Sequence, residues 1–289
     1  MKPTAYGPFR YSPIIRRPVL RWPGGARLAV WVIPNIEYFP LNEKVLMGAG
    51  IVPDVMAWSH RDYGARVGIF RIMEVLDRYK VRGTVALNSL VCDAYPPIIE
   101  ECQKRNWEFM GHNETNSRTL IQIPPESERD VVNATFDRIE KATGTRPKGW
   151  LSSGLTETWG TLDYLVEAGC QYVCDWVNDD QPYPMEVAGK RLMSIPYSSE
   201  INDFGFFMRF GGQPDDFAAM IRRQFDVLYR ESETSGRVMA ICLHPFIIGV
   251  AHRIGALESA LEHIAGHDKV WFATGSEIID AYVSNDVSE

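Results

Sequence analysis

The sequence predicts an α/β fold, a single (β/α) barrel of seven to eight parallel strands with helices between them. Short apolar runs such as residues 27–33 are rich in β-branched and aromatic residues and are typical of strands covered on both faces. Amphipathic stretches such as residues 65–80 separate these runs, which favours a parallel sheet. No glycine-rich phosphate-binding fingerprint follows a predicted strand, so a barrel is favoured over a dinucleotide-binding, doubly wound sheet.

The predicted elements alternate along the chain. Strands are expected at residues 27–33, 84–89, 107–111, 149–151, 171–175, 191–196, 237–243 and 269–273. Helices are expected at residues 65–80, 97–105, 126–143, 158–168, 215–231, 254–265 and 276–283. The connections at 34–64 and 176–214 are longer than ordinary loops, and we expect them to form lids over one end of the barrel.

The length of 289 residues fits one barrel domain, because (β/α) barrels of roughly 250 residues often form a single domain. Residues 1–26 contain prolines and aromatic residues and lack the alternating pattern, so they are predicted to be an N-terminal arm. The barrel domain is predicted to span residues 27–289.

Composition argues against two classes of partner and suggests a compartment. A formal net charge of −7, with no cluster of Lys or Arg, gives nucleic acid or anionic lipid no basic surface to bind. No apolar run reaches the roughly 18 residues of a membrane span, and the first residues lack the apolar core of a signal peptide. The five cysteines form no CxxC pair and are expected to be reduced. We therefore expect a cytoplasmic protein without nucleic-acid or membrane partners.

Reactive residues gather where predicted strands end. In a (β/α) barrel these ends share one face, which carries the active site, so residues far apart in the chain are expected to converge there. The candidates, in chain order, are Asn35, Glu37, His112, Glu114, Asn116, Ser152, Asp175, Glu200 and His244.

Four of these candidates are predicted to be catalytic. His112 and His244 directly end apolar strands, where a histidine needs partners for both ring nitrogens. Glu37 lies close to a buried strand end, where a carboxylate is costly without a partner or a task. Asp175 is either catalytic or the cap of a local turn. By contrast, His263 and His267, four residues apart near the end of a helix, are expected to be solvated rather than metal ligands.

Several motifs occur together in a fixed order. They are WPGGARLAV (22–30), PNIEYF (34–39), DYGARVGIFRIMEVLDRY (62–79), GHNETNS (111–117), DWVNDDQPY (175–183) and LHPFIIGVAHR (243–253). With these motifs the chain resembles the NodB-homology, or polysaccharide deacetylase, superfamily, and within it the allantoinase-like branch, over about residues 21–282. The resemblance implies a distorted (β/α) barrel related to the TIM barrel, and His244 matches the late catalytic histidine of the family.

The resemblance also bears on metal binding. Metal-dependent members hold zinc with an aspartate and an HxxxH pair, and the matching positions here are Glu37, His112 and Asn116. A carboxamide is a poor zinc ligand, and the position of the family's catalytic base is taken by Asn35. The family's arginine and proline after the fourth strand are replaced by WLSSG (150–154). These departures favour the allantoinase-like branch, so no cofactor is expected. If zinc is present, we expect Glu37, His112 and Asn116 to hold it weakly.

The predicted activity is hydrolysis of a non-peptide carbon–nitrogen bond in a small ureide or a cyclic or linear amide, such as allantoin. Glu37 or His112 is expected to activate water and His244 to protonate the leaving nitrogen, while Asn116 and backbone N–H groups hold the oxyanion. Substrate contacts are expected from Asn35, Asn116, Glu114, Ser152, Trp176 and Glu200.

Two alternatives stay open. The first is a metal-dependent deacetylase of N-acetylated saccharides, which would place the protein in carbohydrate metabolism. The second is an inactive barrel that binds a small polar ligand, suggested by the loss of the family's base and of one metal ligand. In each case the expected partner is a small amide or N-acyl molecule, and assembly into a homo-oligomer is left open.

Overall fold

Strand β1 (Leu28–Ile36) pairs with three other strands in the computed structural model, which describes residues 2–285. Strand β8 (Arg237–Leu243) pairs with β1 along one edge. The other edge is shared between β9 (Val270–Phe272) at the start of β1 and β2 (Thr84–Leu87) at its end. The first residue of the predicted arm and residues 286–289 of the predicted barrel domain lie outside the described residues.

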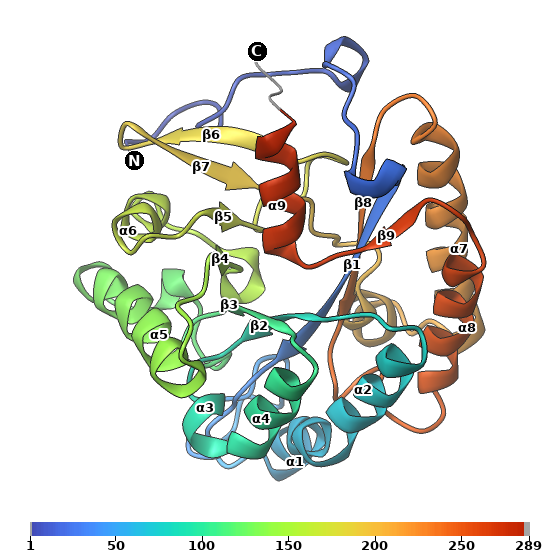
Figure 1. Cartoon of the computed structure of the whole chain (residues 1–289). Coiled ribbons are helices and arrows are strands. Elements are labelled where there is room, and N and C mark those ends of the chain that lie inside the picture. Colours follow the sequence, from blue (N-terminus) through green and yellow to red (C-terminus); the bar gives the residue numbers. More distant parts are fainter. Residues whose placement is uncertain (1, 286–289) are drawn as a thin grey trace.

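The remaining elements continue the alternation. The other strands are β3 (Glu108–Gly111), β4 (Gly149–Trp150), β5 (Tyr172–Val173), β6 (Tyr183–Val187) and β7 (Lys190–Ser194). The helices are α1 (Val55–Tyr63), α2 (Ile69–Arg78), α3 (Val91–Ala94), α4 (Pro96–Lys104), α5 (Glu128–Thr143), α6 (Thr161–Glu167), α7 (Pro214–Glu231), α8 (Ile254–Ala265) and α9 (Gly275–Ser284). Figure 1 shows most of the helices around the outside of a curled sheet.

The predicted α/β fold is confirmed, and the structure refines the prediction of a barrel of parallel strands. The strand order is β6-β7-β5-β4-β3-β2-β1-β8, and all pairs are parallel except β6 with β7. The sheet therefore curls into a half-barrel. No regular strand pair joins β8 to the β6–β7 end among the described residues; single hydrogen bonds from Val238 N to Asp180 O (2.8 Å) and from Cys242 N to Ile201 O (3.0 Å) bridge that side.

Two predicted lids contain regular structure. Helix α1 lies inside the predicted loop 34–64; it shows little amphipathic pattern, because Val55 and Met56 are 64% and 78% exposed. Strand β6 lies inside the predicted loop 176–214 and contains Pro184. Proline lacks a backbone N–H and is therefore tolerated at the edge of a sheet, which is where β6 lies.

Alternation along the strands separates the interior of the half-barrel from its outer face. In β1, Ala29, Trp31 and Ile33 pack into the interior, whereas Leu28 and Val30 pack against the surrounding helices. Because side chains alternate with a period of two, the interior side of β1 continues through Asn35 toward Glu37. The same alternation in β8 places Val238, Ala240 and Cys242 inside, in line with His244.

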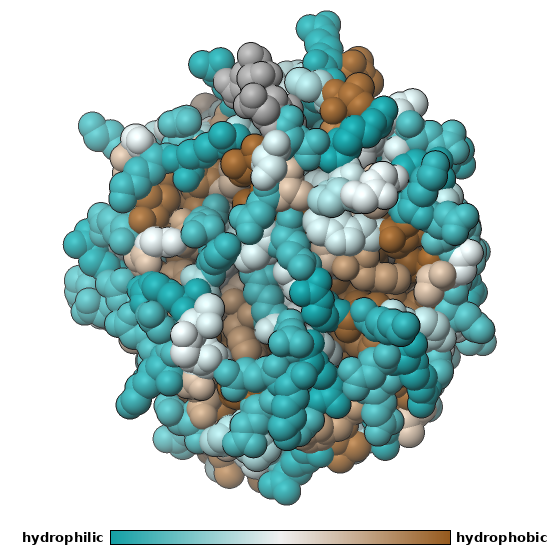
Figure 2. Space-filling model, in the orientation of Figure 1, coloured by the Kyte–Doolittle hydropathy of each residue, from teal (hydrophilic) through white to brown (hydrophobic). Residues whose placement is uncertain are grey.

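Helix α9 covers the amino-terminal end of the strands. Its Ile278 and Ile279 are buried in the interior cluster, and in Figure 1 the helix lies across the middle of the curled sheet. Figure 2, drawn from the same side, shows a largely hydrophilic surface with small separated apolar patches. The opposite end, at the carboxyl ends of the strands, is thus the end left for a binding site.

The amino-terminal arm packs against its own barrel. Pro8 O accepts a hydrogen bond from Glu186 N in β6 (2.9 Å), and Phe9 makes edge contacts with Trp176 and Tyr183.

Among residues 2–285, we find no helix with the length and apolar character needed to cross a membrane.

Candidate active site

Three titratable side chains meet at the carboxyl ends of β1, β3 and β8. Glu37, His112 and His244 each follow the last residue of their strand. The Nε2 atoms of His112 and His244 lie 3.7 Å and 3.6 Å from the same atom, Oε1 of Glu37. The three side chains are only 3–8% exposed, so the interactions between them are weakly screened by water.

His244 is supported by a buried carboxylate. Its Nδ1 lies 2.7 Å from Oδ1 of Asp203, whose Oδ2 accepts the backbone N–H groups of His244 (2.8 Å) and Ile248 (3.2 Å). The Nδ1–H therefore donates to Asp203, and Nε2 faces Glu37. Burial lowers the pKa of His244, but the charges of Asp203 and Glu37 more than offset this and raise it above the ordinary value. His244 is thus suited to donate a proton from Nε2.

The loop after His244 is held by close backbone packing. Gly68 follows α1 in a π-helical turn and touches this loop directly; a Cβ at Gly68 would lie 2.0 Å from Pro245 O. A side chain at this position would push the loop outward. Glycine therefore allows the helix backbone to fix the segment that carries the imidazole.

His112 is supported by a backbone carbonyl instead. Its Nδ1 lies 2.6 Å from Leu151 O, and the pair is buried. A carbonyl oxygen only accepts, so Nδ1 carries a proton, and in the neutral ring Nε2 presents a lone pair toward Glu37. The two imidazoles therefore offer the two halves of a proton transfer, an acceptor at His112 and a donor at His244.

Asn88, at the end of β2, sets the orientation of the amides around these groups. Its Oδ1 accepts the backbone N–H of Tyr38 (2.9 Å), so its Nδ2 must point the other way. That Nδ2 donates to the backbone oxygen of His112 and to Oδ1 of Asn116 (3.1 Å). Asn88 thereby joins the segments that follow β1, β2 and β3.

Asn116 consequently turns its NH₂ group toward the carboxylate. Its Oδ1 accepts from Asn88 and from the Ser153 hydroxyl, and its Nδ2 donates to Oε1 of Glu37. The expected oxyanion role of Asn116 therefore competes with this hydrogen bond. The carboxamide oxygen points away from Glu37, which matters for metal binding.

A small pocket opens onto these groups. Its volume is about 160 Å³. Apolar side chains from several loops form much of its wall, namely Phe39, Leu46, Leu151, Leu155 and Phe204. The polar residues of the wall include Asn35, Ser152, Tyr197, Ser199, Asn202 and Arg209. A pocket of this size and lining suits a small, partly apolar molecule.

Arg61 places a positive charge in the pocket wall. It lies on α1, is 7% exposed, and donates to Leu46 O (2.8 Å) and Ala57 O (3.2 Å). Its guanidinium also lies over the Phe246 ring, 4.9 Å from the centroid. Burial lowers the pKa of Arg61, and the charge of Glu37 opposes this. The residue adds a fixed cation near the reacting groups.

The structure brings six of the predicted site residues together around the pocket. They are Asn35, Glu37, His112, Asn116, Ser152 and His244. Within this group, the amide of Asn35 already donates to Ile33 O (3.3 Å), Leu243 O (3.1 Å) and Tyr197 Oη (3.2 Å), so it ties strand ends together. The Ser152 hydroxyl is fully buried and accepts from Trp150 Nε1 (2.9 Å).

Three residues predicted to bind substrate lie outside the pocket lining. Glu114 follows Asn113, whose φ of 57° turns the chain, and it pairs with Arg138 (2.9 Å). Trp176 packs on Phe9 and donates to Glu157 (3.2 Å). Each lies near a strand end, but the backbone turns away before its side chain can face the pocket.

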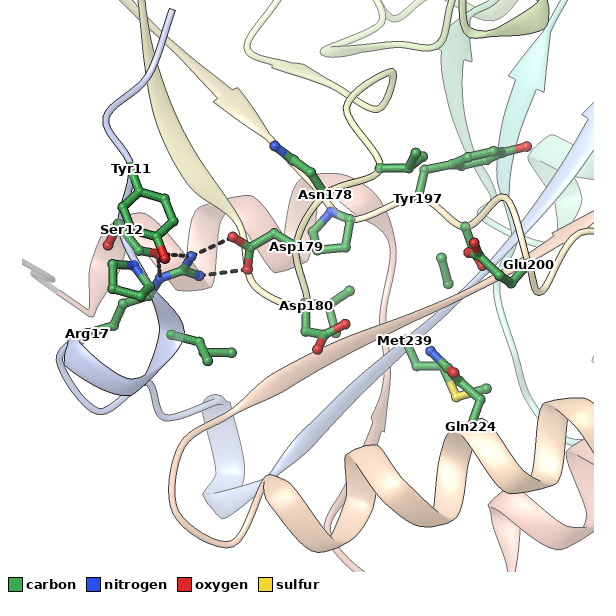
Figure 3. Close-up of a pocket in the computed structure, with 17 residues that line it drawn as sticks. Tyr11, Ser12, Arg17, Asn178, Asp179, Asp180, Tyr197, Glu200, Gln224 and Met239 are labelled. Carbon is green, nitrogen blue, oxygen red and sulfur yellow. Dashed lines mark hydrogen bonds and ion pairs between the residues drawn. The ribbon is translucent and has the colours of Figure 1, made fainter. Parts of the chain in front are cut away.

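The third of these residues, Glu200, lines a different and larger cavity of about 540 Å³ (Figure 3). This cavity is lined by acidic residues, including Asp179, which is paired with Arg17 at 2.6 Å. The Tyr197 ring lines both cavities, and in Figure 3 it extends away from Asp179 and Asp180. No histidine lines this cavity among the described residues, so we place the candidate active site in the smaller pocket.

Asp175, predicted to be catalytic, also lies outside the pocket lining. Cys174 belongs to the interior cluster, so the next side chain points to the outer side of the sheet. There Asp175 Oδ1 accepts the backbone N–H of Ser152 (2.7 Å). Asp175 therefore contacts the segment behind His112 rather than a bound molecule.

Sequence reasoning missed Asp203, Arg61 and Asn88. Asp203 and Arg61 lie within the two long connections, where no strand end or periodic pattern marked them. Asn88 directly follows β2, so the rule that highlighted the other strand ends would have found it.

The donor set does not fit the zinc site of the metal-dependent family members. Glu37 and His112 can act as ligands, but Asn116 presents N–H groups, not a lone pair, to the shared space. A different cluster, Asp226, His263 and His267, brings three potential ligand atoms within 4.8 Å of one another. It involves α7 and α8 on the outside of the barrel and has no contact with the pocket lining.

The chain is similar to known proteins in sequence and in fold. Residues 53–173 match the polysaccharide deacetylase family. A Schizosaccharomyces pombe protein named "Putative polysaccharide deacetylase" is 27% identical over 297 residues, covering 90% of this chain and 92% of its own length. The structure of the "probable Polysaccharide deacetylase" of Pseudomonas aeruginosa matches with a TM-score of 0.87 at 26% identity, covering 94% and 96% of the two chains. PuuE allantoinase matches with a TM-score of 0.86 at 25% identity, covering 94% and 95%.

Proposed function

We propose that this chain is a hydrolase of the polysaccharide deacetylase family and that it cleaves a carbon–nitrogen bond of a small ureide or a cyclic or linear amide without a bound metal ion. The observation that carries the proposal is the pair of imidazoles whose Nε2 atoms face a single carboxylate oxygen, at 3.7 Å for His112 and 3.6 Å for His244. The similarity to PuuE allantoinase supports the same substrate class.

His112 is the proposed base. A water between Glu37 and His112 gives its proton to Nε2 of His112 while its oxygen attacks the amide carbon. Glu37, 3.7 Å from Nε2, stabilises the imidazolium that forms. The Nδ1 hydrogen bond to Leu151 O keeps the ring in the required orientation throughout.

His244 is the proposed acid. As the tetrahedral intermediate collapses, the Nε2–H of His244 protonates the leaving nitrogen, and the carbon–nitrogen bond breaks to give an acid and an amine. The charges of Asp203 and Glu37 raise the pKa of His244, which favours the protonated ring. The cationic Arg61 in the wall favours the negative charge of the intermediate.

The shape of the pocket favours a small substrate over a polymer. A volume of about 160 Å³ is below the range of roughly 300–1,000 Å³ typical of drug-sized ligands.

We further propose that the enzyme works in the cytoplasm, since all five cysteines are buried and unpaired.

A second candidate is deacetylation of a soluble N-acetylated sugar, favoured by the names of the relatives. That reaction uses the same nucleophile and acid, and it would require room for a saccharide beside Phe39 and Phe204.

One experiment separates these functions. Purified protein is incubated with ureides, cyclic amides, linear amides and N-acetylated saccharides, with and without prior chelation, and amine or acid release is measured. We expect turnover of a ureide or small amide that survives chelation. Turnover of only N-acetylated saccharides, abolished by chelation and restored by zinc, would contradict the proposal. Ligand-induced thermal stabilisation without hydrolysis would favour an inactive binding barrel.

A further inference from the structure

We propose that Asp175 is a positioning residue that acts on His112 through the peptide bond between Leu151 and Ser152. The inference deepens the proposed function, since it assumes that His112 serves as the base. It concerns a carboxylate that does not itself line the pocket.

The two hydrogen bonds meet on one peptide group. The Leu151 oxygen accepts from Nδ1 of His112 at 2.6 Å, and the N–H of the same peptide unit, at Ser152, donates to Oδ1 of Asp175 at 2.7 Å. His112, Leu151 and Ser152 are each at most 3% exposed. The three groups thus form a continuous buried chain from a carboxylate to the imidazole.

A peptide group transmits polarisation because its nitrogen, carbon and oxygen are conjugated. A negative charge on the acceptor of the N–H increases the negative charge on the carbonyl oxygen at the other end. Chains of hydrogen bonds strengthen one another in this way inside proteins. The Leu151 oxygen becomes a better acceptor, so it holds the His112 ring more firmly and stabilises the imidazolium formed when water is deprotonated.

A second carboxyl group, Glu157, favours the charged form of the partly buried Asp175. Burial, together with the Asp175 charge, raises the pKa of Glu157 to about 10, so Glu157 holds a proton at neutral pH. Asp175 Oδ2 is buried without an N–H or alcohol donor, which leaves it available to the carboxylic acid proton of Glu157. Burial also raises the pKa of Asp175, while the hydrogen bonds from Ser152 and Glu157 oppose that change.

The decisive variants remove the charge and keep the hydrogen bonds. Asp175→Asn preserves an acceptor for the Ser152 N–H. Because the new carboxamide can donate to Glu157 and let it ionise, the double variant Asp175→Asn with Glu157→Gln is measured as well. We expect kcat to fall about tenfold with KM unchanged, well below the 10²–10⁴ of a general acid or base itself.

A spectroscopic readout separates polarisation from structure and does not require the substrate. The Nδ1 proton of His112 is followed by NMR in the wild type and both variants. It should move upfield as its acceptor weakens, while the backbone spectrum of the barrel stays unchanged. In the wild type alone, this proton and the Ser152 amide proton should both lie far downfield.

The control variant is Glu108→Gln, which removes a partly buried carboxylate at the amino-terminal end of β3. Glu108 accepts from Tyr172 Oη (2.8 Å) and Ser276 N (3.0 Å), far from this peptide group. It should lower stability without moving the His112 signal. An unmoved His112 Nδ1 signal in the folded double variant, or wild-type signals that are not downfield, would overturn the inference. The NMR readout does not depend on enzymatic activity, whereas the proposed function predicts that His112→Ala loses activity. The inference and the proposed function can therefore fail independently.

Discussion

His244 and His112 are the same side chain in two different settings. His244 donates its Nδ1–H to the buried carboxylate of Asp203 at 2.7 Å, whereas His112 donates to the backbone oxygen of Leu151 at 2.6 Å. Both rings face Glu37, but only His244 has a second carboxylate beside it, and the two negative charges raise the pKa of His244. The same residue type is thus prepared as an acid on one side of Glu37 and as a base on the other.

Removing the proposed acid should have the largest effect on turnover. His244→Gln should lower kcat by about 10²–10⁴, the usual contribution of a general acid. His60→Gln is the matched control, because His60 also contacts the Phe246 ring but does not line the pocket. Activity of each variant is measured alongside thermal unfolding. Near wild-type turnover in His244→Gln would remove the assignment of the acid.

Neutralising the carboxylate behind the acid should have the next largest effect. Asp203→Asn keeps an acceptor for Nδ1–H but removes a charge that raises the pKa of His244. That pKa falls, so the proton donor is lost at a lower pH, and the alkaline limb of the kcat profile should move toward acid. We expect about a tenfold to hundredfold loss of kcat at neutral pH. A profile with an unchanged alkaline limb would show that Asp203 only holds the loop.

Asn116→His tests the role of the side chain that contacts Glu37. The substitution removes the N–H that orients Glu37 and supplies an imidazole to complete a three-ligand set with His112. We expect metal-free turnover to fall about tenfold and zinc affinity to rise, as measured by calorimetry and metal analysis. Full metal-free activity would mean that the Asn116 hydrogen bond does not position the carboxylate.

The smallest expected effect is that of chelation on the wild-type enzyme. Because Asn116 offers no lone pair to the shared space, turnover should stay within about twofold of the untreated enzyme after metal removal. Metal analysis is repeated on His263→Ala, since Asp226, His263 and His267 could bind zinc on the surface and confuse the stoichiometry. A strict requirement for one zinc in both proteins would contradict the metal-free mechanism.

The part of the site that could be predicted from the sequence is the part carried by strands. A strand has a period of two and a recognisable apolar pattern, so the residues after β1, β3 and β8 could be expected to converge. Glu37, His112 and His244 do meet there. The edge strand β6 and helix α1 were not predicted, because proline in β6 and exposed apolar residues on α1 obscure the usual patterns.

The part that could not be predicted depends on connections and on backbone atoms. Asp203 lies in a loop far from any strand end, yet it contacts His244 directly. Leu151 acts through its carbonyl oxygen, which no residue type reveals. Glu114 was predicted to bind substrate, but it does not line the pocket. The positive φ of Asn113 turns the chain, so Glu114 points away although it is close to His112 in sequence.

The side chain of Asn88 has a consequence for how such an enzyme can change. The oxygen and the nitrogen of its side-chain amide bind the segments after β1 and β3, so the segments that carry Glu37 and His112 are held to one another rather than to the surrounding loops. Phe39 and Leu46, which line the pocket from those loops, take no part in this lock, whereas Phe204 contacts the His244 ring. Randomising Phe39 and Leu46 should therefore yield enzymes with new substrate preferences while the proton-transfer groups keep their arrangement.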